Sequence, residues 1–290
     1  MTAPIKSTTK PYVSQYLRNT MLNHVLRSAS VVAGSSVWLG LYNQTITYHE
    51  GDNDNWTKVV ETELSGSSYR RVSASNVWTI SNRQASLNTT LEFPIPTGES
   101  WGRVSHYGIS NGSQSGSLLF FGELSASRTI DEGDTFLINP SQINITLNGH
   151  ISTFLANELL DHYLNRNIYT SPSALLHAAL YITLPNQNDA GGVEISGSTG
   201  YARIPCGGTG SWAASAGGSS INLRDIIYAY EVITDWSTIR GICLRDAIAA
   251  GNLLMRADVY PNVTVLYPDG FMIPAALWKM NPIHDAEGVL

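Results

Sequence analysis

The sequence predicts a mainly β protein built of two tandem β-sandwich, jelly-roll-like domains, each preceded by a short amphipathic helix. Three observations lead to this fold class. The 290-residue chain is 43% hydrophobic and only 14% charged, and it holds 25 glycines, a mixture that favours strands and turns. Short apolar runs recur between Gly, Asn and Pro, as in sandwich domains. Two long segments of the chain can also be laid over one another almost end to end.

Each copy begins with a matching amphipathic stretch, residues 16–26 in the first and 154–164 in the second. The aromatic, Leu, Asn, His and final Leu positions coincide without a gap. Their apolar spacing approximates one face of a helix, and Ser14 and Ser152 stand where an N-cap is expected. The sequence therefore predicts two short, equivalent helices.

An apolar strand is expected next, over residues 37–42 and, in the second copy, around 180–184. Local signals conflict in the second copy, because Ser171 and Pro172 resemble the capped start of a helix. The repeat favours a chain that is extended by Leu180.

The most similar segments of the two copies are Glu63–Val72 and Glu194–Ile204, which differ by one inserted residue. Their Tyr-x-Arg-aliphatic ends alternate as a strand would. Later strands are expected at 118–124 and 253–259. Six repeated side chains are interpreted as structural, with the aromatics in the core and the histidines hydrogen-bonded: Trp101, Trp236, Tyr69, Tyr201, His24 and His162.

The repeat predicts the domain organisation. We expect a first domain at 14–148 and a second at 149–280, with an N-terminal arm at 1–13 and a C-terminal tail at 281–290. The arm is polar, contains Pro4 and Pro11, and is expected to order against a neighbouring molecule.

No motif predicts catalysis. Gly108–Gly112 fits Gly-x-Ser-x-Gly, but the residues after it lead into a strand, whereas a nucleophile elbow needs a helix. The Gly207–Trp212 run lacks the Gly-Lys-Ser/Thr of a phosphate-binding loop. We therefore expect no catalytic residue, no cofactor and no enzymatic activity.

A metal site is not expected either. The chain has no His-Glu-x-x-His or Cys-x-x-Cys motif, and the acidic runs at 50–54 and 131–134 lack the spacing of an EF-hand and are interpreted as solvated turns. Cys206 and Cys243 are interpreted as buried or half-buried thiols in a reducing environment.

Charge and hydropathy exclude two further classes of partner. With 17 Lys and Arg residues and a net charge of −6, the chain offers no basic stripe for nucleic acid. No apolar run approaches the ~18 residues that a membrane-spanning helix needs, so no membrane insertion is expected.

The order of motifs resembles a domain of tail-fibre and other minor structural proteins of tailed bacteriophages. The motifs are Glu-aliphatic-Ser-Gly-(x)-Tyr-x-Arg, Trp-Gly-x-Val-x-His-x-Gly-Ile at Trp101–Ile109, Gly-x-Leu-Leu at Gly116–Leu119 and Gly-Asp-x-Phe at Gly133–Phe136. The second copy keeps the first motif and diverges at Trp236–Ile242. The resemblance implies a non-enzymatic virion protein that is synthesised in the cytoplasm of a bacterial host.

Within that class, the expected function is that of a tail component: a fibre, a fibre adaptor or a protein associated with the baseplate or neck. Its expected partners are other virion proteins, and two copies per chain fit a homotrimer on a sixfold element. One alternative is a capsid decoration or cement protein. Another is a receptor- or carbohydrate-binding module that contacts a host surface receptor through loop aromatics, for which the candidates are Trp56 and Trp212.

Overall fold

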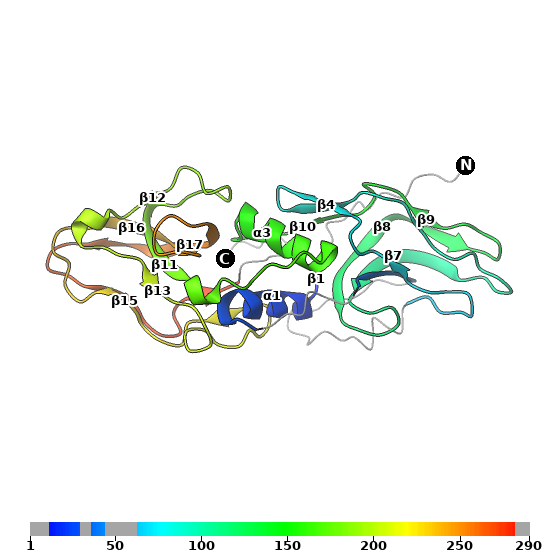
Figure 1. The fold of residues 1–290 in the computed structure, drawn as a ribbon, viewed down its shortest axis with the longest axis horizontal. Coiled ribbons are helices and arrows are strands. Elements are labelled where there is room, and N and C mark those ends of the chain that lie inside the picture. Colours follow the sequence, from blue (N-terminus) through cyan, green and yellow to red (C-terminus); the bar gives the residue numbers. More distant parts are fainter. Residues whose placement is uncertain (1–11, 30–35, 44–62, 282–290) are drawn as a thin grey trace.

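The computed structural model describes residues 12–29, 36–43 and 63–281, and most of its regular elements are antiparallel strands. Figure 1 shows two strand-rich lobes at opposite ends of an elongated molecule, with the helices between them. The first copy forms one lobe and the second copy the other. The predicted fold class, mainly β with two tandem copies, is confirmed.

The first lobe contains a five-stranded sheet in the order β1-β8-β7-β2-β3, a three-stranded sheet in the order β10-β5-β4, and the pair β6-β9. Its strands are β1 (Tyr12–Val13), β2 (Trp38–Tyr42), β3 (Val72–Ser73), β4 (Trp78–Ser81), β5 (Gln84–Leu87), β6 (Leu91–Glu92), β7 (Gly102–Ser110), β8 (Leu118–Ile130), β9 (Leu137–Ile138) and β10 (Asn144–Thr146).

The second lobe repeats this plan. Its main sheet runs β12-β11-β16-β17, with β13 also paired to β11, and β14-β19 and β15-β18 form separate pairs. The strands are β11 (His177–Thr183), β12 (Val193–Glu194), β13 (Ile204–Pro205), β14 (Ser220–Ile221), β15 (Ile226–Ala229), β16 (Ser237–Arg245), β17 (Leu253–Val265), β18 (Phe271–Ile273) and β19 (Lys279–Met280).

The register of the central strands is the same in both lobes. Strand β2 pairs with β7 from Trp38 opposite Ser110, and β11 pairs with β16 from His177 opposite Arg245. The long strands also bulge at equivalent places, because residues 124–127 of β8 and 259–262 of β17 have no partner in the register. A bulge at the same place in both copies is a regular part of the domain fold rather than a local defect.

Both predicted helices are present. Helix α1 (Gln15–Arg27) begins after Ser14, whose side chain accepts a hydrogen bond from the Leu17 N–H at 3.1 Å. Helix α3 (Thr153–Leu160) begins after Ser152, which accepts one from the Leu155 N–H at 3.1 Å. The chain then continues as a π-helical turn, η1 (Asp161–Asn165). Each cap satisfies an N–H group that the first helical turn leaves free.

Two other local expectations have different outcomes. The chain is extended by Leu180, as the repeat predicts, and the Ser-Pro signal produces one short 3₁₀ turn, η2 (Ser173–Leu175). The strand expected over the Tyr-x-Arg segments is wrong for the Tyr and Arg positions. Only Val72–Ser73 and Ile204–Pro205 pair as strands. The Leu41 and Leu180 N–H groups, which a longer paired strand would use, donate instead to the hydroxyls of Tyr69 and Tyr201.

The segment expected to be an N-terminal arm contributes to the fold at its end. Tyr12 and Val13 pair with Phe121 and Phe120 of β8 in the same chain. These two residues of the expected arm are therefore ordered by their own chain and not by a neighbouring molecule. Residues 1–11 of the arm and 282–290 of the tail lie outside the described residues.

One cluster of buried hydrophobic side chains extends through both lobes and both helices. Trp101, Trp236 and Tyr201 belong to it, and Tyr69 packs against it. In each lobe the Tyr ring meets the Trp ring edge to face, with centroids 5.3 Å apart for Tyr69 and Trp101 and 5.7 Å apart for Tyr201 and Trp236. The prediction that these aromatics are structural is confirmed.

Candidate functional site

A buried polar cluster in the first lobe gathers the residues of its most repeated motif. The Arg71 guanidinium donates to both oxygens of Glu63, from Nε to Oε1 at 2.7 Å and from Nη2 to Oε2 at 2.6 Å. Tyr69 donates its hydroxyl proton to Glu63 at 3.1 Å and accepts a hydrogen bond from the Leu41 N–H at 2.9 Å. The side chains of Arg71 and Glu63 are 2% and 11% exposed. Such burial of opposite charges requires this bidentate pairing.

The second lobe repeats the cluster atom for atom. Arg203 donates to both oxygens of Glu194 at 2.8 Å. Tyr201 donates to the same carboxylate at 3.0 Å and accepts from the Leu180 N–H at 2.8 Å. This pair is more exposed, at 9% for Arg203 and 23% for Glu194. The repeated arrangement explains why the Tyr-x-Arg spacing is shared by the two copies.

The remaining nitrogen of each arginine fastens a hairpin tip. Arg71 Nη1 donates to the carbonyls of Gly112 and Ser115 at 2.6 and 3.2 Å. Arg203 Nη1 donates to the carbonyls of Ala247 and Ala250 at 2.9 and 2.6 Å. Each cluster therefore ties the Glu-Tyr-Arg segment to the turn between the two longest strands of its lobe.

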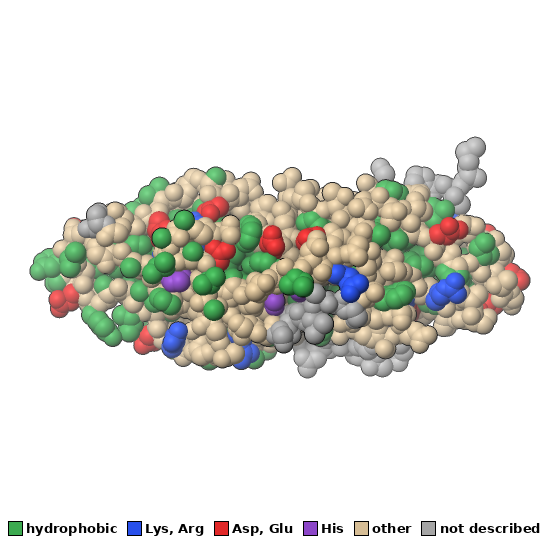
Figure 2. All heavy atoms as spheres, viewed as in Figure 1, with side chains coloured by type: hydrophobic (Ala, Val, Ile, Leu, Met, Phe, Trp, Pro, Cys, Tyr) green, Lys and Arg blue, Asp and Glu red, His purple; other side chains and the backbone are tan. Residues whose placement is uncertain are grey.

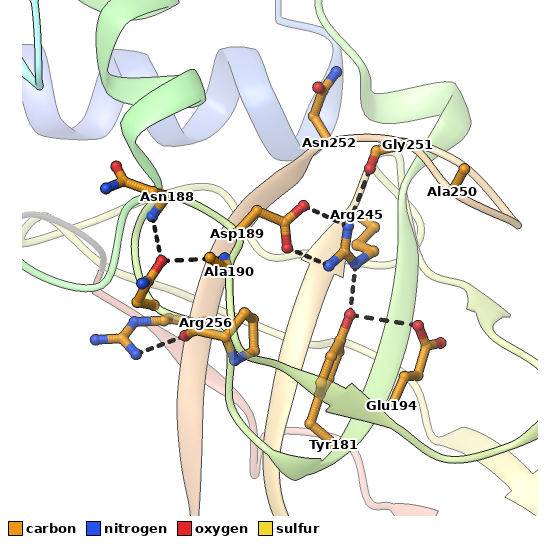
Figure 3. Close-up of polar contacts among 12 residues, drawn as sticks. Tyr181, Asn188, Asp189, Ala190, Glu194, Arg245, Ala250, Gly251, Asn252 and Arg256 are labelled. Carbon is orange, nitrogen blue, oxygen red and sulfur yellow. Dashed lines mark hydrogen bonds and ion pairs between the residues drawn. The ribbon is translucent and has the colours of Figure 1, made fainter.

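The second lobe carries an additional pair, shown in Figure 3. Arg245 donates to both oxygens of Asp189, at 2.9 and 2.5 Å, and to the Tyr181 hydroxyl at 2.7 Å. Tyr181 in turn donates to Glu194 at 3.4 Å, which joins this pair to the repeated cluster. Nothing in the sequence pattern pointed to Arg245, because the first copy has Ser110 at that register position.

The pKa values of these groups describe a fixed charge network. Burial raises the pKa of Tyr69 and Tyr201, and it raises that of Tyr181 to about 12 against the opposing charge of Arg245. Burial also raises the pKa of Glu194, but the hydrogen bonds and charge of Arg203 more than offset this, and the pKa lies below its ordinary value. The phenols stay protonated and the Glu194 carboxylate stays charged near neutral pH, so these groups are not poised for proton transfer there.

Ser110 of the Gly-x-Ser-x-Gly sequence stands at the end of β7 and precedes a hairpin. Its hydroxyl is fully buried, accepts from Arg71 Nη1 at 2.7 Å and donates to the Gly112 carbonyl at 3.2 Å. The next element is strand β8 rather than a helix. The interpretation as a hairpin loop is confirmed, and the strand-turn-helix context of a nucleophile elbow is missing.

Trp212 lies in the core, so the expectation that it is an exposed loop aromatic is wrong. It is 0% exposed. Its indole N–H donates to the Cys206 carbonyl at 2.5 Å and its ring meets that of Trp278 edge to face. The Gly and Ser residues before it form turns, and the sequence alone does not distinguish such turns from an open loop. Trp56, the other candidate, lies outside the described residues.

The two matched histidines have the structural role that the sequence predicts. His24 lies within hydrogen-bond distance of the carbonyls of Ala29 and Tyr169, at 3.2 and 2.9 Å. His162 Nδ1 lies 3.1 Å from the Asn167 carbonyl and accepts from the Tyr169 N–H at 3.2 Å.

The cysteine prediction is confirmed, since Cys206 and Cys243 are buried and free. Burial raises the pKa of each thiol to about 12. Residues 131–134 form an exposed turn in which the Asp134 carboxylate accepts from the Asp131 N–H at 3.1 Å. The acidic run at 50–54 lies outside the described residues.

Within 12–29, 36–43 and 63–281, no group of three or more His, Cys, Asp or Glu side chains could hold a metal ion. Over the same residues, no helix has the length and hydropathy to cross a bilayer.

The far ends of the two lobes differ in surface chemistry. In the second lobe, two adjoining loops are joined by hydrogen bonds from Val232 N to the Asp269 carbonyl and from Tyr267 N to Asp235, both at 2.8 Å. Together with the adjacent strand β18 they expose apolar side chains, and Figure 2 shows hydrophobic side chains at this end of the molecule, on the left. We call this surface the second-copy end, formed by Tyr230, Ile233, Leu266, Tyr267 and Met272.

The equivalent positions of the first lobe follow from the shared spacing of Trp101 and Gly116 with Trp236 and Gly251. They are Ile95, Gly98, Asp131, Glu132 and Leu137. Of these five, Ile95 alone is an exposed large hydrophobic residue. At three of the five positions the second copy therefore exposes an apolar side chain, Ile233, Leu266 or Tyr267, where the first copy has glycine or a carboxylate.

Comparison with known proteins agrees with the repeat. No curated protein matches the chain. The family model described as podophage GP4 fiber I protein gp80 matches twice in tandem, over residues 12–146 and 150–280. These two matches cover most of the sequence, and the chain belongs to the family of the podophage GP4 fiber I protein gp80.

Proposed function

We propose that this protein is a non-enzymatic connector in the tail-fibre apparatus of a bacteriophage, and that its second-copy end is buried against another virion protein. The family is one of phage fibre proteins. Membership supports a location in the virion and contacts with other virion components. The finer role, a piece that joins two different partners through its two ends, rests on the shape and surface of the molecule.

The observation that carries the proposal is the difference between the ends. Tyr230, Ile233 and Tyr267 are 80%, 71% and 66% exposed. Exposed apolar side chains that adjoin in this way mark an interaction surface more often than isolated ones do. The first lobe has Gly98, Asp131 and Glu132 at the positions of Ile233, Leu266 and Tyr267. Most of the apolar surface is therefore not required by the domain fold, and a partner specific to this end accounts for it.

The charges beside the surface define the partner. Segments 229–236 and 266–272 contain three carboxylates, Glu231, Asp235 and Asp269, and no Lys or Arg. An interface of this kind has an apolar centre and a charged rim. The complementary partner is a virion protein with an apolar patch rimmed by Lys or Arg.

The decisive experiment changes the second-copy end in the intact phage. A Tyr230→Ser/Tyr267→Ser variant should fold normally, because both rings are exposed, yet its content in purified particles should fall at least tenfold. The matched control is Ile95→Ser, which removes the exposed apolar side chain at the position equivalent to Tyr230 and should leave incorporation unchanged. Quantitative mass spectrometry of particles measures both.

The outcomes separate the alternatives. Normal incorporation of the double variant combined with loss of host adsorption would assign the end to a receptor- or carbohydrate-binding module and overturn the connector proposal. Recovery of the protein on tailless capsids would assign it instead to capsid decoration.

The same proposal includes a homotrimer, in which three chains present six domains around one axis. Mass photometry of the purified protein should give three times the 31.5 kDa chain mass. A monomer both in solution and in assembled particles contradicts the trimer while leaving the connector role to the incorporation test.

A further inference from the structure

Each helix of the molecule covers a hairpin of the other copy. Helix α1 belongs to the first copy by sequence, and the chain enters it from a hydrogen bond between Ser14 N and the Leu119 carbonyl of β8. From Asn19 onward it makes polar contacts with residues 208–218 of the second copy, and His24 also contacts Tyr169 and Ser171. Helix α3 enters from a bond between Ser152 N and the Leu254 carbonyl of β17, and then contacts β4 and β5 of the first copy.

The contacts are reciprocal and involve matched residues. Asn19 and Asn157 are equivalent helix positions in the repeat. Asn19 Oδ1 accepts from the Gly218 N–H at 2.9 Å, and Asn157 Oδ1 accepts from the Arg83 N–H at 2.8 Å. Both donors lie in the turn of the opposite hairpin, and both have positive φ, 75° for Gly218 and 66° for Arg83.

The C-terminal halves of the helices make a second pair of equivalent hydrogen bonds to the opposite copy. Leu26 and Leu164 are again equivalent positions, and their carbonyls accept from Gly208 N at 2.9 Å and Asn76 N at 3.1 Å. Between these pairs the rings of His24 and His162 stack on one another, with centroids 5.3 Å apart and planes inclined by 15°. Two equivalent residues in mutual contact define the axis of a local twofold relation, as in an isologous interface.

The apolar side chains of both helices are also buried where the two copies meet. Leu17, Met21, Leu22, Val25 and Leu26 of α1 are at most 2% exposed. Leu155, Leu159, Leu160 and Leu164 of the second helical segment are at most 1% exposed. All belong to the core cluster that extends through both lobes. The helices are therefore buried at the junction of the two copies.

In each copy, the helix and the hairpin that receives the other copy's helix form one face, which we call the helix-and-hairpin face. We infer that this face is a self-complementary docking surface whose partner is another copy of the same domain. It holds the two lobes together without the covalent connection. The connecting residues 147–151 serve to bring the two copies to a high effective concentration. This assignment is independent of the proposed role of the protein in the fibre.

The test uses the full chain with a protease site flanked by Gly and Ser inserted between Asn148 and Gly149. Cleavage of the folded protein should leave a complex that elutes at the mass of the intact chain and separates in denaturant. Two fragments that separate on cleavage in native buffer overturn the inference.

Variants identify the surface. In the cleaved protein, Asn19→Ala and Asn157→Ala each leave a backbone N–H without its acceptor, and each should raise the dissociation constant at least tenfold. The control is Asn88→Ala, whose side chain donates to Thr79 within the first copy and should leave the dissociation constant unchanged. Equal effects of all three substitutions would place the affinity elsewhere than on the exchanged helices and contradict the assignment.

Discussion

The two copies place a Glu, a Tyr and an Arg in the same buried arrangement, but the second copy adds Arg245 and Asp189 beside it, with Ser110 at the equivalent position of the first. Their far ends differ more, since Ile233, Leu266 and Tyr267 of the second copy stand where the first copy has glycine or a carboxylate. The comparison shows where the domain tolerates change. Buried contacts are kept or extended with a complete set of partners, because an unpaired buried charge is costly, whereas exposed loops diverge and give each end its own surface.

The largest expected effect concerns a core feature that both copies share. Trp78 and Trp212 are buried, and each donates its indole N–H to a backbone carbonyl, of Ala74 and Cys206 respectively. Trp78→Ala and Trp212→Ala should each lower the free energy of unfolding by about 4 kcal/mol, measured by urea denaturation. A Trp212→Ala protein of unchanged stability that fails to adsorb to cells would show a ligand contact instead.

The buried ion pairs should distinguish the copies. Arg71→Ala leaves the Glu63 carboxylate buried without its cation and should cost about 3 kcal/mol. Arg203→Ala should cost less, about 1.5 kcal/mol, because Glu194 is more exposed to water. Denaturation midpoints at neutral pH measure both. A Glu63→Gln/Arg71→Met double variant should recover part of the loss, and equal costs in the two copies would remove the proposed role of exposure.

A smaller effect is expected at the serine of the Gly-x-Ser-x-Gly sequence. Ser110→Ala removes one of three acceptors that Arg71 Nη1 contacts, the others being the Gly112 and Ser115 carbonyls. The loss of stability should be about 1 kcal/mol. A loss above about 3 kcal/mol would mean that the hairpin tip depends on this hydroxyl as strongly as on the arginine.

The smallest effect is a pH dependence at the junction of the copies. Burial lowers the pKa of His162, and His24 lowers it further, against an opposing hydrogen bond to Asn167. Protonation therefore favours the unfolded chain. The stability contributed by the neutral ring is present above the ordinary histidine pKa and is lost as the pH falls through the folded value.

The urea midpoint should accordingly fall between pH 7.5 and pH 5.5, and fall less in His162→Gln. Burial also lowers the pKa of His106, so a residual fall in that variant is expected. An identical fall in wild type and His162→Gln would show that His162 does not contribute to the pH dependence in this range.

Particular residues show how far the sequence could predict this structure. Ser14 and Ser152 as helix caps, the strand at Leu180 and the hairpin at Ser110 follow from short-range rules, and the repeat settled the case in which local signals conflicted. The Tyr-x-Arg strand was wrong because an alternating pattern also fits an unpaired segment whose Tyr and Arg side chains both contact one buried glutamate.

The remaining errors and omissions have one physical cause. The Gly and Ser residues around Trp212 have the composition of an open loop, although the Trp212 side chain is buried. Asn19 and Asn157 read as polar residues on the outer face of a helix, since their hydrogen-bond partners lie about 75 to 200 residues away along the chain. Contacts between distant segments do not change local composition or periodicity. The sequence of a helix therefore does not show which segment the helix will pack against.

The exchange of helices has a mechanical consequence. A tail fibre is pulled when a particle attached to a cell drifts in flow, and a chain of beads joined by a linker yields at the linker first. Here a load applied between the two ends passes through α1 and α3, each of which is anchored in one lobe at its start and packed on the other lobe along its length. Pulling would have to shear both helices from their hairpins together. The molecule should thus resist extension as one body up to the force at which its core unfolds.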